Sequence, residues 1–183
     1  MLALYSDRLK IRTLQDQDWS LFAAIHQDPL LNQYVRTPDP IETIQAKFDA
    51  RLQPWHYESG DWLTLTIEEN ATGQALGFTG FYASNAELKQ AEVGYMLSHQ
   101  GQGQGYATEA LAAVIDWACL SLQVHKFIGL CAEQNQGSRR VLERCGFQLE
   151  GLLRHNYKLG EQWVDDCYYG LLADDRYSAG ITG

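Results

Sequence analysis

The chain has 183 residues, of which 45% are hydrophobic, 11% aromatic and 20% charged. This length and composition are typical of one globular domain, residues 1–183, with a sizeable apolar core. The formal net charge of -9 repels nucleic-acid phosphates and anionic lipid surfaces, so neither is an expected partner. The same charge mildly favours a basic or amine-bearing partner.

The cysteines and histidines predict neither a metal site nor a redox motif. The four cysteines include no CxxC pair, and the five histidines show no metal-ligand spacing. No run of about 18 apolar residues is present to span a membrane, and the early charges at the N-terminus are unlike a secretory signal. Free thiols without an export signal predict a cytoplasmic protein.

The start of the chain predicts a strand and then a helix. Apolar and polar side chains alternate at residues 8–13, which is typical of a strand. We expect Asp16 or Asp18 to cap a first helix that runs through Ala24. The dipeptide that begins at Asp28, Asp-Pro, is expected to end this helix.

A second helix is predicted after Pro40, which we expect at its first position, where a proline needs no backbone donor. Apolar side chains then recur at spacings of three and four residues, which indicates one buried helix face. They are Ile41, Ile44, Phe48, Leu52 and Trp55.

The middle of the chain changes to the two-residue period of strands. Residues 62–68 and 75–82 flank the turn sequence Asn-Ala-Thr-Gly, which predicts a hairpin. A further strand is expected at residues 91–98, directly before a glycine-rich stretch. Residues 106–122 carry apolar side chains at helical spacing and therefore predict a helix.

The last third predicts a strand at residues 126–132 and a short helix at 138–145 that Gly146 ends. A closing pair of strands is expected at 147–157 and 164–172, on either side of a glycine turn. Taken in order, the elements predict an α/β protein with a mixed sheet that is mostly antiparallel at its start.

The stretch Gln100–Gly105, sequence QGQGQG, carries the strongest functional signal. Glycine lets the backbone bend with positive φ and approach a ligand closely. The first N–H groups of the following helix lack internal partners, so loop and helix together form an anion site. No Lys or Arg occurs from Ser98 to Gly105, so backbone dipoles would hold a phosphate here. The alternative is a flexible connector.

The glycine spacing distinguishes three types of phosphate loop. The stretch lacks the GK[ST] ending of a P-loop, and its G-x-G-x-G spacing differs from the G-x-G-x-x-G of a dinucleotide-binding loop. A nucleotide-cofactor oxidoreductase is therefore disfavoured. Gln100, Gly103 and Gly105 instead fit the pattern Q/R-x-x-G-x-G/A.

That third pattern resembles the acetyl-coenzyme A loop of the GNAT superfamily of N-acetyltransferases. The resemblance extends from DRLKIRTL near the N-terminus, through AEVGYMLS and GYATEAL around the loop, to NQGSRRVLERCGF and GEQWVDDCYYGLL. The last two blocks are similar to the branch of ribosomal-protein N-terminal acetyltransferases of the RimJ/RimL type. The resemblance implies an α/β (α+β) GNAT fold, with a mixed, mostly antiparallel sheet of about six to seven strands flanked by about four helices.

The resemblance also implies direct transfer of acetyl from the thioester of acetyl-coenzyme A to a primary amine, without a metal. The amine must lose a proton to attack, the thioester oxygen needs a fixed donor, and the departing thiolate benefits from a proton. The expected acceptor is a protein N-terminus or a small amine, such as a polyamine or an aminoglycoside, and the resemblance allows a homodimer. The alternative is a coenzyme A-binding sensor or scaffold without turnover.

Position by position, the resemblance assigns a coenzyme role to residues of the loop, of the strand before it and of the NQGSRR segment. They are Met96, Leu97, Gln102, Gly103, Gln104, Gly105, Tyr106, Ala107, Asn135, Ser138 and Arg140. The backbone N–H of Met96 or Leu97 would donate to the thioester oxygen. Asn135 would bind the pantetheine arm or anchor the next helix. Arg140, together with Arg139, would reach an outer phosphate or remain a solvated pair.

Three further roles concern the amine and the thiolate. Glu92 is the expected base, beside a narrow position at Gly94 that a substrate could occupy, and the alternative is a solvated glutamate. Ser138 is the expected proton donor, because Leu142 stands where many members of the family have a tyrosine, and the alternative is a helix cap. Asp165 would face the acceptor amine or organise the site. Three tryptophans line an acceptor pocket or pack in the core: Trp55, Trp62 and Trp163.

Overall fold

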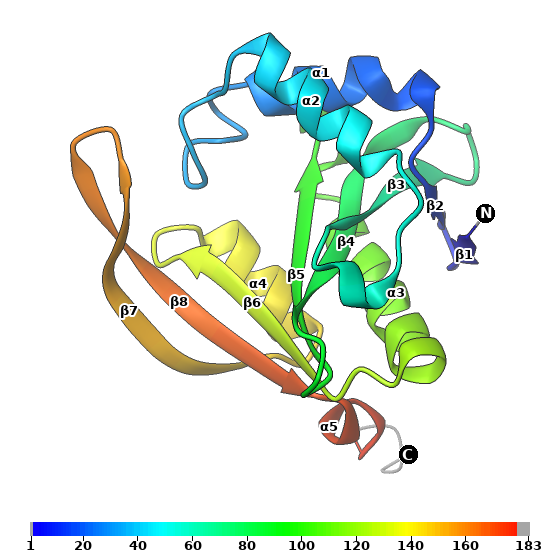
Figure 1. Cartoon of the computed structure of the whole chain (residues 1–183), viewed down its shortest axis with the longest axis vertical. Coiled ribbons are helices and arrows are strands. Elements are labelled where there is room, and N and C mark those ends of the chain that lie inside the picture. Colours follow the sequence, from blue (N-terminus) through cyan, green and yellow to red (C-terminus); the bar gives the residue numbers. More distant parts are fainter. Residues whose placement is uncertain (1, 179–183) are drawn as a thin grey trace.

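The computed structural model describes residues 2–178, in which an eight-stranded mixed sheet is flanked by five α-helices (Figure 1). The strands are β1 (Ala3–Tyr5), β2 (Leu9–Thr13), β3 (Leu63–Glu69), β4 (Ala75–Asn85), β5 (Gln90–Leu97), β6 (Lys126–Ala132), β7 (Gln148–Leu159) and β8 (Gln162–Leu172). The helices are α1 (Trp19–Gln27), α2 (Ile41–Arg51), α3 (Tyr106–Leu122), α4 (Gln136–Arg144) and α5 (Ala173–Ser178), with short 3-10 turns at η1 (Asp16–Asp18), η2 (Tyr57–Ser59) and η3 (His99–Gly101). The strand order is β1-β2-β3-β4-β5-β6-β8-β7.

The predicted fold class is confirmed, and the described residues contain one strand and one helix more than expected. The extra strand, β1, is three residues long and pairs with β2 across a tight turn. The extra helix, α5, is six residues long and follows β8 directly. Elements this short depend on their neighbours for stability. They also have too few residues to show a hydrophobic period, so the sequence does not reveal them.

Both N-terminal helices have boundaries that differ from the prediction. Helix α1 continues past Ala24 to Gln27, and it ends before Asp28 as expected. Helix α2 begins one residue after Pro40, which is extended and precedes the helix. Because α2 ends at Arg51, the last two members of the predicted stripe lie beyond it: Leu52 is the C-cap, and the ring of Trp55 packs edge-on against Tyr57 and Phe81.

Asp18, one of the two predicted caps of α1, forms a buried ion network instead of a cap. Both Asp16 and Asp18 lie in turn η1. Asp18 occupies the N-cap position of α1, but its side chain makes no capping bond to that helix. The carboxylate of Asp18 accepts two bonds from the guanidinium of Arg12, at 2.8 and 2.9 Å, and one from the hydroxyl of Thr66 at 2.8 Å. Arg12 also donates to Glu68 on β3 at 2.8 Å. The network joins β2 and β3 to the start of α1.

The sheet divides into two halves where β5 meets β6. Strands β1 to β5 pair antiparallel with their neighbours, and so do β6, β8 and β7. The parallel contact between the halves lasts only three residue pairs, from Gln90 opposite Lys126 to Glu92 opposite Ile128. Beyond Glu92 the two strands diverge (Figure 1), so residues 93–97 of β5 have no strand on that edge within the described chain.

Two apolar clusters hold the helices against the antiparallel half. Phe78 of β4 belongs to the cluster under α1 and α2, whereas Phe81 of the same strand packs near Trp117 of α3. The stripe that α3 buries is Ala110, Leu111, Val114, Ile115 and Ala118. Burial of each large side chain contributes about 1.5–3 kcal/mol, so these contacts fix the start of α3 relative to β5.

We expect the substitution Asp18→Asn to lower the free energy of unfolding by about 3 kcal/mol, because it leaves the buried guanidinium of Arg12 with an incomplete counter-charge. Burial opposes ionisation of Asp18, but the bonds from Arg12, Gln15 and Thr66 outweigh it, so its pKa lies below the usual value. A carboxylate of this kind stabilises the fold above its unfolded pKa of about 3.9, and this contribution is lost as the pH falls through the folded pKa.

Denaturant titrations of the two proteins at neutral and acidic pH check this expectation. Wild type and Asp18→Asn should differ most near neutral pH and converge in acid. The control Asp61→Asn, at an exposed position, should change stability by less than about 0.5 kcal/mol. A pH-independent difference would show that the charge of Asp18 contributes nothing.

Candidate functional site

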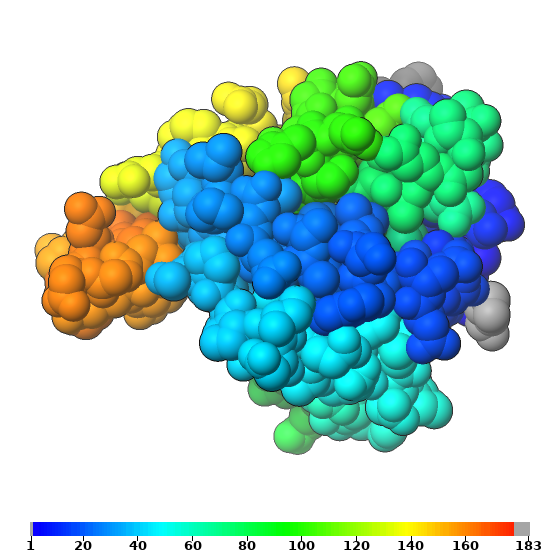
Figure 2. Space-filling view, turned by 90° about the horizontal axis from the view of Figure 1, so that it is seen from above, coloured from blue at the N-terminus to red at the C-terminus, as the bar shows by residue number. Residues whose placement is uncertain are grey.

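The divergence of β5 from β6 opens a groove of about 1140 Å³ between the halves of the sheet. Its wall is formed by strands β4, β5 and β6, the glycine-rich loop, helix α4 and the segment 28–36. Figure 2 shows that the lighter-blue residues between α1 and α2 lie over this region, between the orange β7/β8 hairpin and the green residues near α3. This segment is bonded to the β7/β8 hairpin, because the hydroxyl of Tyr157 donates to the carbonyl of Tyr34 at 2.6 Å.

The glycine-rich loop forms one end of the groove. Gly103 and Gly105 adopt φ values of 75° and 80°, a conformation that glycine accepts without strain. Both line the groove, together with Gln102, Tyr106 and Ala107. Within the described chain, the backbone N–H groups from Gly103 to Thr108 form no hydrogen bond, and the N–H of Glu109 is the first to bond, to the carbonyl of Gly105 at 3.1 Å. These donors therefore remain available to an anionic ligand.

A cation from a distant segment braces the outer side of this loop. Arg8, directly before β2, donates to the carbonyl of Gln104 at 3.0 Å and pairs with Glu109 of α3 at 2.6 Å. Its guanidinium also lies 4.6 Å from the ring centre of Tyr106. Neither Arg8 nor the side chain of Gln104 lines the groove, so the predicted coenzyme contact of Gln104 would be made by its backbone N–H. The sequence carries no local signal for this brace, because the two segments are 96 residues apart.

Helix α4 supplies positive charge that the loop itself lacks. Arg140 and Arg144 lie one turn apart, are exposed, and both line the groove. Arg139 instead donates to the hydroxyl of Tyr169 at 3.1 Å, and that hydroxyl donates to Glu143 at 2.8 Å. Arg140 therefore lies where the sequence predicts, Arg139 belongs to the packing of α4 on the sheet, and Arg144 was not predicted.

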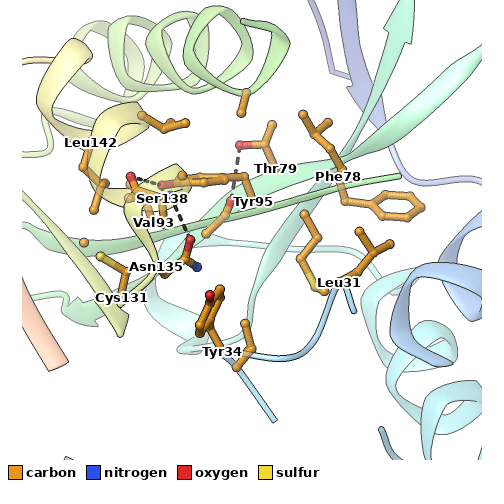
Figure 3. A pocket seen from close by; sticks show the side chains of 18 of the residues that line it. Leu31, Tyr34, Phe78, Thr79, Val93, Tyr95, Cys131, Asn135, Ser138 and Leu142 are labelled. Atoms are coloured by element: carbon orange, nitrogen blue, oxygen red, sulfur yellow. Dashed lines mark hydrogen bonds between the residues drawn. The ribbon is translucent and has the colours of Figure 1, made fainter. Parts of the chain in front are cut away.

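The structure shows which of Asn135 and Ser138 caps the helix that follows them. Helix α4 begins at Gln136, two residues earlier than predicted, and the side chain of Asn135 caps it by accepting from the N–H of Ser138 at 3.0 Å. Ser138 is therefore not the cap. Its hydroxyl lies 2.7 Å from the hydroxyl of Tyr95 on β5 (Figure 3), and burial raises the pKa of that tyrosine. Tyr95 thus places a phenol beside Ser138 although the expected position holds Leu142.

Glu92 is half-buried at the point where the two strands diverge. Burial raises the pKa of its carboxyl, the hydroxyl of Tyr82 lowers it by donating a bond of 2.8 Å, and the charge of Asp166 raises it further, with a net increase. Asp166, on β8, is buried in the same groove, and burial raises its pKa while Asn156 lowers it. Two carboxyls of raised pKa therefore share this part of the wall.

The prediction that Asp165 faces the acceptor needs correction. Its carboxylate accepts from the backbone N–H of His155 at 2.7 Å, and Asp165 does not line the groove. Side chains alternate along a strand, so its neighbour Asp166 points to the opposite face, into the groove. The sequence alone does not show which of two adjacent aspartates in a strand points into the groove, because this depends on which face of the strand is turned toward it.

The space above Gly94 is filled by a side chain rather than left for a substrate. A Cβ at this position would lie 2.9 Å from Cη2 of Trp62, so the indole lies directly on the glycine. Trp62 lines the groove, and its ring centre is 4.9 Å from that of Tyr82. Of the other tryptophans, Trp55 packs against the core and Trp163 is 54% exposed.

The backbone alternation of β5 directs only one of the N–H groups of Met96 and Leu97 toward the open edge. The N–H of Ser98 bonds to the carbonyl of Leu76 on β4 at 2.9 Å. Because successive residues direct their backbone groups to opposite edges, Met96 faces β4 and Leu97 faces the open edge. The side chain of Gln102 donates to the carbonyl of Leu97 at 3.4 Å, which agrees with this orientation.

The comparisons with known proteins agree with this arrangement. The sequence matches the family described as "Acetyltransferase (GNAT) domain" over residues 8–148. This chain belongs to the GNAT acetyltransferase family. It is an N-acetyltransferase, so the predicted enzyme class is confirmed and the sensor or scaffold without turnover is disfavoured.

Three similar proteins illustrate the range of the family. The N-acetyltransferase p20 of Bacillus licheniformis is 27% identical over 94% of this chain and 97% of its own. The ribosomal-protein-serine acetyltransferase of Escherichia coli is 32% identical over 56% of this chain and 58% of its own, which confirms the likeness to the RimJ/RimL branch. A crystal structure of spermidine N-acetyltransferase from Vibrio cholerae, in complex with CoA and spermine, has a TM-score of 0.82 at 17% identity, covering 94% of this chain and 99% of its own.

The described part of the chain lacks a metal cluster and a membrane-spanning helix. Residues 2–178 contain no group of three or more His, Cys, Asp or Glu side chains that could hold a metal ion. Among the helices of the same residues, none has the length and apolar character needed to cross a membrane.

We expect Ser138→Ala and Tyr95→Phe each to lower kcat by about tenfold to a hundredfold, with a smaller effect on the affinity for the acyl donor, because we predict that the two hydrogen-bonded hydroxyls act as one proton-donating pair. For the same reason, the double variant should lose little more than either single variant. Steady-state kinetics on the four proteins test this, with Ser84→Ala at an exposed position as control. Additive losses, or an unchanged rate for Ser138→Ala, would remove the pair from the reaction.

Proposed function

We propose that this GNAT enzyme uses acetyl-coenzyme A to acetylate a primary amine by direct attack, with Glu92 as the base. The observation that supports the proposal is the placement of three groups along one groove. Unpaired amides of the glycine-rich loop lie at one end, the open edge of β5 at Leu97 follows, and the half-buried carboxyl of Glu92 lies beyond it.

The residues of the groove fit an elongated, anionic acyl donor. The free N–H groups from Gly103 to Thr108 suit a diphosphate, and Arg140 and Arg144 suit a further phosphate. Residues 93–97 offer an unpaired strand edge, which can hydrogen-bond an extended chain of amides. The spermidine N-acetyltransferase with the same fold is in complex with CoA, which supports this assignment.

The side chains of the groove supply the groups that acetyl transfer needs. The N–H of Leu97 donates to the thioester oxygen as negative charge develops there. Glu92 accepts the proton of the amine, so that the nitrogen bonds to the carbonyl carbon as the carbon–sulfur bond breaks. The hydroxyl pair of Ser138 and Tyr95 gives a proton to the departing sulfur and regains one from water.

The acceptor is a protein N-terminus or a small amine. The relatives support both classes, since one is named for a ribosomal protein and another for spermidine. Release of free thiol from acetyl-coenzyme A, measured with N-terminal peptides and small amines, tests the proposal. Absence of turnover with every amine would contradict it.

We expect Gly103→Glu to abolish this turnover by weakening coenzyme A binding at least about a hundredfold, because a carboxylate there would repel a diphosphate. A Cβ at Gly103 meets no atom within 4 Å, so the first carbon of a side chain has open space there. The control Gly103→Gln has the same size and the same strain of about 1–2 kcal/mol at positive φ, and it should bind more tightly than the Glu variant. Calorimetric titration with coenzyme A measures both, and equal affinities would contradict the loop assignment.

The pH profile tests Glu92 as the base. Because the base must be ionised, kcat/KM should fall in acid below the raised pKa of Glu92. Asp166→Asn removes a like charge and should move this acid limb to lower pH, whereas Tyr82→Phe removes a donor to the carboxylate and should move it to higher pH. Glu92→Gln should lower kcat/KM by about a hundredfold. Profiles that coincide in all variants would exclude Glu92.

A further inference from the structure

Arg51, the last residue of α2, is a half-buried cation in the groove wall, beside Trp62. No carboxylate of the described chain lies within ion-pair distance of its guanidinium. Its contacts are aromatic: the guanidinium carbon lies 5.6 Å from the ring centre of Phe22 and 5.9 Å from that of Trp62. The charge of Arg51 is therefore packed on rings and not neutralised.

A second arginine of the same sign lies nearby. Burial, and then the charge of Arg36, lower the pKa of Arg51 to about 10. Arg36 also lines the groove, from the segment between α1 and α2. Asp39 places negative charge near Arg36, but Lys47 binds that carboxylate in an ion pair. The corner formed by Arg36 and Arg51 keeps a net positive charge.

His26 adds no charge to this corner at neutral pH. Its ring stacks on Phe22 at 4.0 Å, and its Nδ1 lies 2.8 Å from the carbonyl of the same residue. Burial lowers the pKa of His26 to about 4, with contributions from Arg36 and Arg51. An imidazole that stays neutral beside two guanidiniums leaves the corner suited to an anion.

The corner and the catalytic carboxylate lie along one continuous wall. Trp62 touches the corner at Arg51, its ring lies 4.9 Å from that of Tyr82, and the hydroxyl of Tyr82 binds Glu92 at 2.8 Å. One end of the wall is therefore positive, the other is negative, and an indole separates them. A half-buried charge without a partner costs free energy, which a bound counter-ion would recover.

We propose that Arg51, assisted by Arg36, binds an anionic group of the acceptor, so that the enzyme selects amines that also carry a carboxylate or phosphate. The inference rests on the proposed function, because it takes Glu92 as the position of the amine. A guanidinium matches a carboxylate or phosphate with two parallel hydrogen bonds, which gives direction as well as affinity. A purely cationic polyamine meets like charge at this corner. A small amino acid and a peptide N-terminus with an acidic side chain share the required chemistry.

Acceptors that differ only in charge test the proposal. One pair is the peptide Ala-Asp-Ala against Ala-Asn-Ala, and the other is 4-aminobutyrate against 4-aminobutanamide. The acid should exceed its amide in kcat/KM by about tenfold to a hundredfold in at least one pair, as expected for a hydrogen bond between charged groups. Preference in the first pair identifies a peptide acceptor, and preference in the second a small one. A ratio near one in both pairs overturns the proposal.

Variants of the corner assign the preference to its residues. Arg51→Gln should bring the acid-to-amide ratio close to one, and Arg51→Lys should restore part of it. The control Arg154→Gln, at an exposed position of β7 outside the groove, should keep the wild-type ratio. A ratio unchanged in both Arg51→Gln and Arg36→Gln overturns the proposal. If thermal melting shows that Arg51→Gln is unfolded, the wild-type ratio and Arg36→Gln decide.

A binding measurement separates this inference from the proposed function. Calorimetry of the coenzyme A-loaded protein with 4-aminobutyrate and Ala-Asp-Ala, each against its amide, reports the anion site without any turnover. Binding that depends on Arg51, with no acetyl transfer, would support the anion site and contradict the proposed reaction. Transfer without a preference for the acid would support the reaction and contradict the anion site.

Discussion

The parallel pairing of β5 with β6 stops at Glu92, and the groove depends on this short contact. Three residue pairs are enough to keep the two halves of the sheet in one structure. Their early end leaves the backbone of residues 93–97 unpaired on one edge, in the middle of a sheet where such groups are normally bonded. The same divergence brings side chains of α4 toward those of β5, so that Ser138 meets Tyr95. The opening and the groups that line it therefore have one cause.

Contacts between distant segments keep this opening in shape. The brace from Arg8 to Gln104 and Glu109 ties the glycine-rich loop to the N-terminal strands, while the buried pair of Arg12 and Asp18 ties those strands to α1. Both contacts use an arginine with several donors, which can hold two segments at a fixed angle. The loop is thus positioned by charges on its outer side, and its amides on the inner side remain unpaired.

Local patterns in the sequence predict the fold class, seven of the eight strands and the position of the glycine-rich loop. These patterns report which way a side chain points within one element, and they contain nothing about which element lies opposite. The proximity of Tyr95 to Ser138, and of Arg8 to the loop, joins segments 43 and 96 residues apart, and no period within either segment encodes it. The sequence names Asp165, whereas Asp166 lines the groove, for a related reason: the face of β8 that meets the groove depends on the elements packed beside it.

The distribution of charge shows why net charge is a weak guide to the partners of this enzyme. The chain carries a formal charge of -9, yet the groove has arginines at both ends and carboxyls between them. Long-range repulsion between an acidic protein and an anionic ligand is screened beyond about 8 Å at physiological ionic strength. A half-buried arginine acts within that distance and in a less polar medium, so its attraction is screened less. The side chains that meet the ligand therefore govern its selection, and Arg51, which composition cannot distinguish from any surface arginine, lies in the groove wall without an ion-pair partner among the described residues.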